Sequence, residues 1–386
     1  MEILRRVRVP TGDILVVDGE TGYLELISVG DYGKDVNLKC DSMGLTRVPD
    51  KVRHTDMLPL EEKWVITIST QYGCSMGCKF CDVPLVGPGK NATTKDMIEQ
   101  IEAGISLHPK VKTTERLNIH FARMGEPTWN RNVIEAAMML KEMEENPPTS
   151  WTLRKCKIHP VVSTMMPSQN KDVLPFLREW MHVKNVTYEG NAGLQLSINS
   201  TDEQERFGMF NNNSCRMIDD IGHIMRVVPA PVGRKITLNF AVANYTVDPD
   251  ELLRFFSPDR YIIKLTPMHN TTTATKNNIQ TDGDYTEYYP YKELEEKLKA
   301  AGYDVIVFIA SKEEDESRIT CGNAILTDKI GMAVTCRECG MIKQPIGRSA
   351  PMGTAGSYCT TDCGGYWNDP KPSQLWPGET QEEFGY

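Results

Sequence analysis

Three cysteines in one short loop are the residues of this chain best suited to chemistry. They form a C-x3-C-x2-C run with an aromatic residue directly before the last one: Cys74, Cys78, Phe80 and Cys81. Three thiolates can hold three irons of a cubane [4Fe–4S] cluster, whereas a closed electron-transfer cluster takes four. The fourth iron then stays open to a small chelating molecule, so the spacing indicates chemistry at that corner. Three unrelated buried cysteines, or half of a zinc site, are the alternatives.

The spacing of this loop resembles that of the radical S-adenosylmethionine (radical SAM) superfamily. The resemblance implies that SAM chelates the open iron and that an electron from the cluster splits it into methionine and a 5′-deoxyadenosyl radical. A second motif, Met124-Gly125-Glu126-Pro127, follows the next apolar strand. A glycine lets the backbone approach a ligand, and a glutamate offers an acceptor to an ammonium group. The motif resembles the superfamily segment that holds the SAM amino group, and a simple proline turn is the alternative.

A narrower resemblance covers residues ~64–328 of the sequence. The segments 69–74 and 124–130, together with three strand ends, look like those of the ribosomal and transfer RNA adenine methyl synthases. The strand ends are Val162-Ser163-Thr164, Leu196-Ser197-Ile198-Asn199 and Leu265-Thr266-Pro267-Met268-His269-Asn270. From these motifs and the loop aromatic, we expect the residues that bind SAM to be Phe80, Gly125, Glu126, Pro127, Ser163, Ser197, Asn199, His269 and Asn270.

Cys321 lies in a segment, Thr320 to Ala324, that looks like the methyl-carrying segment of the same family. The resemblance implies that Cys321 receives a methyl group from one SAM and that a second SAM gives the radical that activates this methyl. A thiolate suits the first step because it is a strong nucleophile. An inert packing cysteine is the alternative. One position departs from the family, because Thr67 stands where the family has a second catalytic cysteine that resolves the enzyme–RNA adduct.

Four further cysteines form two close pairs near the carboxyl terminus. They are Cys336 with Cys339, and Cys359 with Cys363. Four thiolates at this spacing predict a closed metal site. We favour structural zinc, because a short C-x2-C turn suits a zinc knuckle. A second iron–sulfur cluster is the alternative, since four-sulfur geometry permits both metals.

The order of apolar runs predicts an α/β fold. Strand-like runs alternate with amphipathic helices over residues 63–312, which predicts parallel strands with helical crossovers. The resemblance implies a partial (β/α)6 radical SAM barrel, with the chemistry at the carboxyl ends of its strands. We expect three units: a small β-rich N-terminal unit over 1–62, the barrel over 63–312, and a C-terminal extension over 313–386 that carries Cys321 and the four-cysteine site.

Composition narrows the setting in which the chain works. Its 386 residues carry a net charge of −9, and 40% are hydrophobic. No apolar run approaches the ~20 residues of a membrane span, so we expect no membrane partner. The eleven cysteines include groups with the spacing of metal ligands, which indicates a reducing compartment. We therefore expect the protein to be located in the cytoplasm. The negative charge lowers the expectation of an RNA substrate without excluding it, because RNA-binding domains usually carry a basic patch.

Three functions follow from these patterns. The first is a methyl synthase-like methyltransferase that acts on an RNA purine through Cys321. The second is a radical SAM enzyme of another reaction type, acting on a nucleotide, a metabolite or a peptide, which Thr67 and the net charge favour. The third is a metal-organised binding module without catalytic activity, which the loop spacing disfavours. Either enzyme needs an electron, so a flavodoxin- or ferredoxin-like donor is the expected partner.

Overall fold

The computed structural model describes most of the chain up to Thr327. The described residues are 1–9, 11–31, 57–212, 214–280, 289–309, 314, 316–327, 334–335 and 342–343. The four cysteines of the predicted C-terminal metal site, Cys336, Cys339, Cys359 and Cys363, lie outside these residues. That site, its metal and the boundaries of the three expected units therefore stay predictions.

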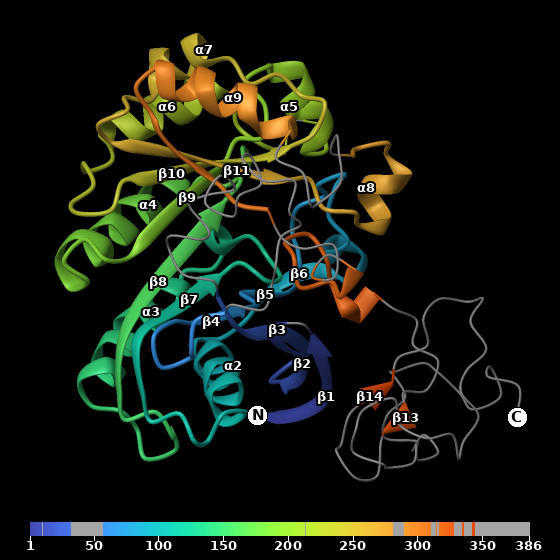
Figure 1. Ribbon diagram of the computed structural model, residues 1–386, viewed down its shortest axis with the longest axis vertical. Coiled ribbons are helices and arrows are strands. Elements are labelled where there is room, and N and C mark those ends of the chain that lie inside the picture. The colour runs from blue at the N-terminus through green and yellow to red at the C-terminus, as the bar shows by residue number, and fades with distance from the viewer. Residues whose placement is uncertain are drawn as a thin grey trace, which may run out of the picture.

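The described chain is built around one mixed sheet of ten strands (Figure 1). In sheet order the strands are β1 (Glu2–Val9), β2 (Gly12–Gly19), β3 (Gly22–Gly30), β4 (Trp64–Ile68), β7 (Thr113–Phe121), β8 (Lys155–Thr164), β9 (Gly193–Ser197), β10 (Ile236–Val242), β11 (Tyr261–Pro267) and β12 (Asp304–Val307). Neighbours from β4 to β12 run parallel, and neighbours from β1 to β4 run antiparallel. The α/β prediction is confirmed, and the partial barrel is taken up below.

The first three strands extend the sheet beyond β4. The strands β2 and β3 pair across the glycine-bounded turn at 18–22, with Gly19 opposite Gly22. The strand β3 then pairs with β4, with Ile27 opposite Thr67. The edge of the parallel strands is therefore covered by antiparallel chain. Two shorter pairs lie outside this sheet: β5 (Gln71–Gly73) with β6 (Pro88–Asn91), and β13 (Val334–Thr335) with β14 (Ile342–Lys343).

Helices follow most of the parallel strands along the chain. They are α2 (Thr94–Ser106), α3 (Asn132–Glu145), α4 (Val173–His182), α5 (Glu203–Met209), α6 (Ile218–Val227), α7 (Pro249–Phe255), α8 (Thr272–Lys276) and α9 (Tyr289–Ala300). The helix α2 begins with a capping box, because the Thr93 hydroxyl accepts from the Asp96 N–H while the Asp96 carboxylate accepts from the Thr93 N–H. Such a box satisfies two N–H groups that the first turn leaves without helical partners.

Alternation along the strands separates a helix-covered face of the sheet from the opposite face. In β7, Leu117, Ile119 and Phe121 are fully buried in the hydrophobic core that the helices cover. The residues between them, Asn118 and His120, point the other way, because successive strand residues face opposite sides. We call this second side the inner face. Its members from other strands include Thr67, His159, Ser163 and Lys264.

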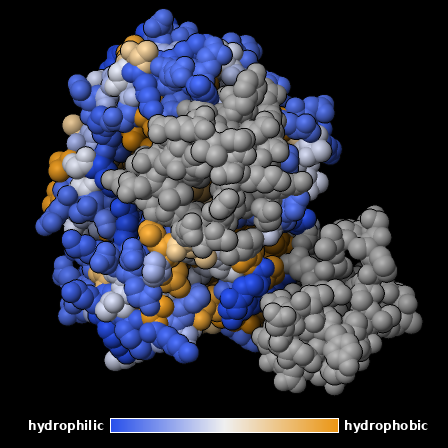
Figure 2. Space-filling view, viewed as in Figure 1, coloured by the Kyte–Doolittle hydropathy of each residue, from blue (hydrophilic) through white to orange (hydrophobic). Residues whose placement is uncertain are grey.

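The described surface is mostly hydrophilic, with hydrophobic residues in small groups, on the face that Figure 2 shows. Of the helices in the described part of the chain, none combines the length and the apolar character that crossing a bilayer requires. The expectation of a cytoplasmic protein is not tested further by the fold.

Candidate active site

The three-cysteine loop begins where β5 ends and is closed at its base by the turn before β6. The Cys74 N–H donates to the carbonyl of Gly87 at 3.1 Å. At Gly73 the backbone has φ +82°, and a Cβ there would lie 2.3 Å from the same carbonyl oxygen. Only glycine fits this conformation and this approach. The glycine before the first cysteine therefore fixes where the loop starts.

The three thiols of the loop lie in one electrostatic neighbourhood. All three are free and half-buried, and Cys78 Sγ lies 3.9 Å from Met165 Sδ. Burial raises the pKa of the Cys74 thiol to about 11. Burial, then Cys81 and Cys74, raise the pKa of Cys78, and burial and Cys74 raise that of Cys81. Thiolates so placed repel one another, and the positive charge of a bound metal offsets that repulsion and favours the deprotonated thiols.

This donor set fits a cubane cluster in number and kind of ligand. Such a cluster takes one thiolate at each of its ligated corners, whereas zinc needs its ligands to converge on a single point. Among the described residues, no set of three or more His, Cys, Asp or Glu side chains is grouped to hold a single metal ion. The cysteine-rich segment 74–81 is thus a candidate for a cluster with one open corner.

The side chain of Gln71 joins the cysteine loop to the second motif. Its Nε2 donates to the Gly89 carbonyl at 3.1 Å and to Asn91 Oδ1 at 2.8 Å. Its Oε1 accepts from the Glu126 N–H at 3.0 Å. One buried amide therefore sets the position of β6 and of the Met124–Pro127 turn together. The sequence placed Gln71 in a matching segment without giving it a role.

The turn at Gly125 packs directly on Gln71. Gly125 has φ +99°, and a Cβ there would lie 2.7 Å from both Cβ and Cγ of Gln71. The Thr70 N–H donates to the Met124 carbonyl at 2.8 Å, which ties this turn to the end of β4. The glycine is thus required by backbone conformation and by space.

Replacing Gly125 by alanine is expected to destabilise the protein by about 2–5 kcal/mol. Roughly 1–2 kcal/mol comes from forcing an L-residue to positive φ, and about 1–3 kcal/mol from the overlap with Gln71. Urea denaturation measures the change. The matched control is Gly208→Ala, because a Cβ at Gly208 meets no atom within 4 Å. Equal stability of the two variants would contradict this reading of the turn.

Glu126 is buried beside the thiols and already accepts several hydrogen bonds. Its Oε1 accepts from the Thr128 N–H at 3.1 Å and the Thr128 hydroxyl at 2.7 Å, and its Oε2 accepts from the Met165 N–H at 3.1 Å. Burial raises the pKa of this carboxyl. The Thr164 side chain is a fourth hydrogen-bond partner of this carboxyl, so an ammonium group would have to share its acceptor oxygens. Pro127 is buried next to it in the same turn.

The remaining residues predicted to bind SAM lie at or just after the carboxyl ends of three strands. Ser163 belongs to β8, Ser197 to β9, and His269 and Asn270 follow β11. Asn199 is buried with φ +63°, and its Oδ1 accepts from the Ala241 N–H at 3.0 Å. Because these strands are parallel, their carboxyl ends lie at one edge of the sheet, which is the edge that also carries the cysteine loop.

Phe80 and Asp82 tie the end of the cysteine loop to the segment after β11. The Phe80 ring packs edge-on against Phe210, with centroids 5.4 Å apart, and its carbonyl accepts from the Thr271 hydroxyl at 2.9 Å. The buried Asp82 carboxylate accepts from the Thr273 N–H at 2.8 Å and the Thr273 hydroxyl at 2.6 Å. The sequence analysis missed Asp82, although an acid directly after the last loop cysteine is a visible signal.

Arg206 is a second residue that the sequence analysis missed. It is fully buried, and its guanidinium donates to the carbonyls of Ser197 at 2.9 Å and Met165 at 3.1 Å. These carbonyls lie at the ends of β9 and β8. The guanidinium also lies over the Phe210 ring, 4.8 Å from its centroid. Arg206 therefore joins two strand ends and the aromatic pair beside the cysteine loop.

Cys321 is exposed, and its turn lies against the end of the cysteine loop. The carbonyl of Gly322 accepts from the Asp82 N–H at 2.7 Å. A Cβ at Gly322, where φ is +87°, would lie 3.2 Å from the Phe80 carbonyl oxygen and 3.7 Å from Cys81 Cα. The structure thus brings together a free thiol near the carboxyl end and three thiols that come about 240 residues earlier in the chain.

A buried ion pair fixes the segment that carries Cys321. The Arg123 guanidinium pairs with the Glu25 carboxylate, and both side chains are essentially inaccessible to solvent. Arg123 also donates to the carbonyls of Arg318 at 2.9 Å and Thr320 at 3.4 Å. On the other side of Cys321, Glu25 Oε2 accepts from the Ile325 N–H at 2.9 Å. The pair therefore holds the backbone on both sides of the exposed thiol.

Thr67, which replaces a cysteine of the resembled family, lies on the inner face of β4. It pairs in register with His120 of β7. Burial, followed by the charges of Lys264 and Arg234, lowers the pKa of His120 to about 3. The residue opposite Thr67 on β7 is thus an imidazole base.

Comparison with known proteins gives relatives for about half to two thirds of the chain. No family model matches it. The dual-specificity RNA methyltransferase RlmN 2 of Myxococcus xanthus is 26% identical over 198 residues, which are 50% of this chain and 48% of that protein. RlmN of Sorangium cellulosum is 24% identical over 263 residues, or 67% of this chain and 61% of its own length. The chain thus spans about half of the first relative and less than two thirds of the second.

A solved radical SAM methyltransferase from Sphaerobacter thermophilus has the same fold, with a TM-score of 0.60 over 84% of this chain and 81% of that one, at 18% identity. In sequence this chain is thus similar to RlmN RNA methyltransferases over part of their length, and in fold it is similar to a radical SAM methyltransferase. The resemblance inferred from the sequence motifs is confirmed.

Proposed function

We propose that this chain is a radical SAM methyltransferase that modifies a purine of RNA, with Cys321 as the methyl acceptor. The observation that carries the proposal is the contact of the Cys321–Gly322 turn with Phe80 and Cys81. An acceptor thiol has to lie near the place where SAM is bound. The RlmN relatives are named as RNA methyltransferases, which supports RNA as the substrate.

In this proposal Cys74, Cys78 and Cys81 hold a [4Fe–4S] cluster, and a flavodoxin- or ferredoxin-like donor reduces it. The bound cluster supplies the electron for the cleavage of SAM. The surrounding residues bind and orient SAM: Glu126 accepts a hydrogen bond from its ammonium group, and Phe80 packs against its adenine. The strand ends at Ser163, Ser197, Asn199, His269 and Asn270 complete the site, together with Gly125 and Pro127 of the second motif.

Cys321 supplies the nucleophile. Its thiol first loses a proton, and the thiolate then attacks the methyl carbon of the sulfonium. One carbon–sulfur bond forms on Cys321, and the other breaks with its electron pair leaving on S-adenosylhomocysteine. The exposed position of Cys321 gives SAM access to this thiol, and the Arg123–Glu25 pair holds its backbone while the bond forms.

The finer architecture belongs to the same proposal. The parallel strands β4 to β12 would form a partial (β/α)6 barrel, with the inner face lining it and the site at its carboxyl end. The C-terminal extension would be held by zinc, or by a second cluster, at its four cysteines. The protein would work in the cytoplasm, where RNA and small electron-transfer proteins are present.

The experiment is anaerobic reconstitution of the full chain with iron, sulfide, a reductant and methyl-labelled SAM. Mass spectrometry of the Cys321 peptide then reports whether the label is on sulfur, and digestion of bulk RNA reports labelled purines. The proposal requires label at Cys321 and two SAM molecules consumed for each methyl group found in RNA. An unmodified Cys321 in a preparation that methylates RNA overturns it.

Thr67 favours a second candidate, a radical SAM enzyme of another reaction type that acts on a nucleotide, a metabolite or a peptide. Without a thiol at this position, a covalent adduct between enzyme and RNA lacks the group that resolves it in the resembled family. The discriminating result is deuterium from substrate in 5′-deoxyadenosine, with no methyl group gained by any product. This candidate predicts no label on Cys321.

A further inference from the structure

A row of basic side chains crosses the inner face at the amino-terminal edge of the sheet, opposite the edge that carries the cysteine loop. Arg116 lies in β7, His159 is the fifth residue of β8, and Arg234 lies two residues before β10 begins. Thr164, at the other edge, is five positions beyond His159 along β8, a distance of about 16 Å. The row is therefore distinct from the proposed active site.

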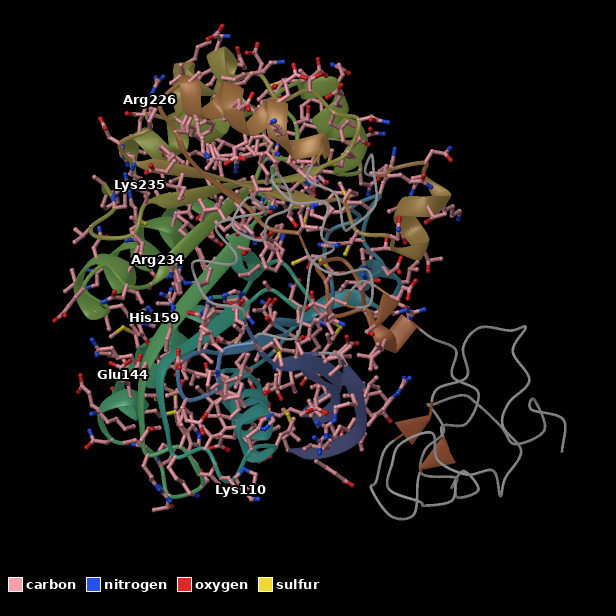
Figure 3. The ribbon with its side chains drawn as sticks, in the orientation of Figure 1. Lys110, Glu144, His159, Arg226, Arg234 and Lys235 are labelled. Atoms are coloured by element: carbon pink, nitrogen blue, oxygen red, sulfur yellow. The ribbon has the colours of Figure 1, made fainter. Side chains whose placement is uncertain are left out.

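The three side chains converge through two polar groups that lie between them. Arg234 Nη1 donates to the Asn191 carbonyl at 3.2 Å, and His159 Nδ1 lies 3.4 Å from the same oxygen. Arg116 Nε donates to Asn118 Oδ1 at 3.0 Å, and Asn118 pairs in register with His159. Figure 3 labels Arg234 and His159 close together on one side of the molecule.

A tight backbone contact fixes the Arg234 guanidinium above the sheet. A Cβ at Gly193, the first residue of β9, would lie 3.4 Å from Arg234 Nη1 and 3.1 Å from a methyl of Val161. The Arg234 N–H donates to the Gly190 carbonyl at 3.1 Å, and the buried Lys184 ammonium donates to that carbonyl at 3.3 Å. Gly193 thus leaves the space that the guanidinium occupies.

No carboxylate of the described residues forms an ion pair with Arg116, His159 or Arg234. The nearest acids have other partners: Glu144 pairs with Lys141 at 2.5 Å, and Asp31 pairs with Lys63 at 2.5 Å. Like charges held close together without a counterion repel one another. The free-energy cost of this repulsion falls when an anion binds between the charges. The row therefore has the charge and the spare donors for an anion.

The titration of these groups agrees with their mutual repulsion. Arg234 is exposed as a whole residue, but its guanidinium lies among neighbouring protein atoms. This burial of the guanidinium, followed by the charge of Arg116, lowers the pKa of Arg234 to about 10. Burial, Arg116 and Arg234 lower the pKa of His159 to about 4, against the opposing effects of the Asn191 carbonyl and Glu144. A bound phosphate reverses the sign of the local potential and favours the protonated histidine.

We propose that Arg116, His159 and Arg234 form a binding site for a phosphate group at the amino-terminal edge of the inner face. Guanidinium groups present paired N–H donors that match phosphate oxygens, and here one guanidinium comes from β7 and the other from the segment before β10, with β8 and β9 between them. The phosphate belongs either to an RNA backbone or to a small phosphate compound. This site does not depend on the proposed methyl transfer.

The test uses inorganic phosphate and the full-length chain without cluster or SAM. Phosphorus-31 NMR at constant ionic strength is expected to show saturable broadening of the phosphate line by the wild-type protein. Arg234→Met and Arg116→Met are each expected to weaken phosphate binding about tenfold or more, because each removes charge-assisted hydrogen bonds. Arg234→Lys, which keeps the charge and loses the fork, is expected to bind with intermediate affinity. Circular dichroism establishes that each variant is folded.

Lys235→Met is the matched control. It removes one positive charge from the next residue, but Lys235 pairs with Asp304 at 2.7 Å and is no part of the row. Phosphate binding by this variant is expected to stay within about twofold of wild type, because screening weakens the effect of an exposed charge. Absence of saturable binding in the wild type, or equal binding by Arg234→Met and Lys235→Met, overturns the proposal.

A short single-stranded RNA distinguishes the two sources of phosphate. If the RNA displaces phosphate, and Arg234→Met weakens RNA binding as it weakens phosphate binding, the site holds an RNA backbone phosphate. If the RNA does not displace phosphate, the site holds a free phosphate or a phosphomonoester. Both outcomes support the site. Neither requires methyl transfer, so the proposed function can fail while the site stands.

Discussion

Replacing Cys321 by alanine is expected to abolish the methylation of RNA, with a loss of about 1,000-fold or more. Removing the group that carries the covalent intermediate costs an enzyme of this type nearly its whole rate. Reductive cleavage of SAM is expected to stay within about threefold of wild type, because Cys321 is not one of the three loop cysteines. The measurements are methyl label in RNA and 5′-deoxyadenosine formed in the same reaction.

Cys156→Ala is the matched control for this change. Cys156 is buried in β8 on the helix-covered side of the sheet, and burial raises the pKa of its thiol to about 12. A thiol so protected from ionisation is inert, so this variant is expected to methylate RNA as wild type does. RNA methylation that survives in Cys321→Ala would remove the carrier role from Cys321.

Replacing Arg123 by methionine is expected to lower the free energy of unfolding by about 3–5 kcal/mol. The substitution leaves Glu25 as a buried carboxylate without its cation, and an uncompensated buried charge is among the most costly single changes. It also removes two hydrogen bonds to the backbone before Cys321. Urea denaturation measures the stability. The rate at which iodoacetamide alkylates Cys321 is expected to change with it, because the segment loses its anchor.

The control for Arg123→Met is the same substitution at an exposed pair. Arg131 pairs with Glu179, and about half of each side chain is exposed to solvent. Arg131→Met is expected to change stability by less than about 1 kcal/mol, since water screens such pairs. A similar small loss in both variants would show that the Arg123–Glu25 pair does not hold the Cys321 segment in place.

Local periodicity was enough to predict the parallel part of the fold. Apolar runs and helical spacings gave the strands and helices of the segment 63–312, because both patterns repeat within a few residues. The ten-strand order could not be obtained in that way. The pairing of β3 with β4 joins residues separated by the polar stretch 31–57, and periodicity carries no information about which edges meet. Those N-terminal strands therefore looked like a separate unit.

The sequence predicted the candidate site at positions that require a glycine or a cysteine. It predicted much less well the polar side chains that only hold other residues in place. Spacing revealed the three-cysteine loop, and Gly125 matched a motif whose turn has positive φ. Gln71, Asp82 and Arg206 act through hydrogen bonds to backbone groups 40 to nearly 200 residues away. A polar residue with such a role has no pattern of its own in the sequence. The four C-terminal cysteines and their metal remain a prediction.

The partners of Glu25 also constrain the order in which the polypeptide can acquire its structure during synthesis. Its carboxylate pairs with a guanidinium 98 residues downstream and accepts a hydrogen bond from an amide 300 residues downstream. Neither contact can form before those residues have been synthesised. The antiparallel strands around Glu25 have local contacts and can form early, since short loops close at little entropic cost. The stretch bearing Cys321 can dock only after nearly the whole chain has left the ribosome. The exposed thiol of Cys321 is thus set in place late, onto a cysteine loop whose surroundings have already folded.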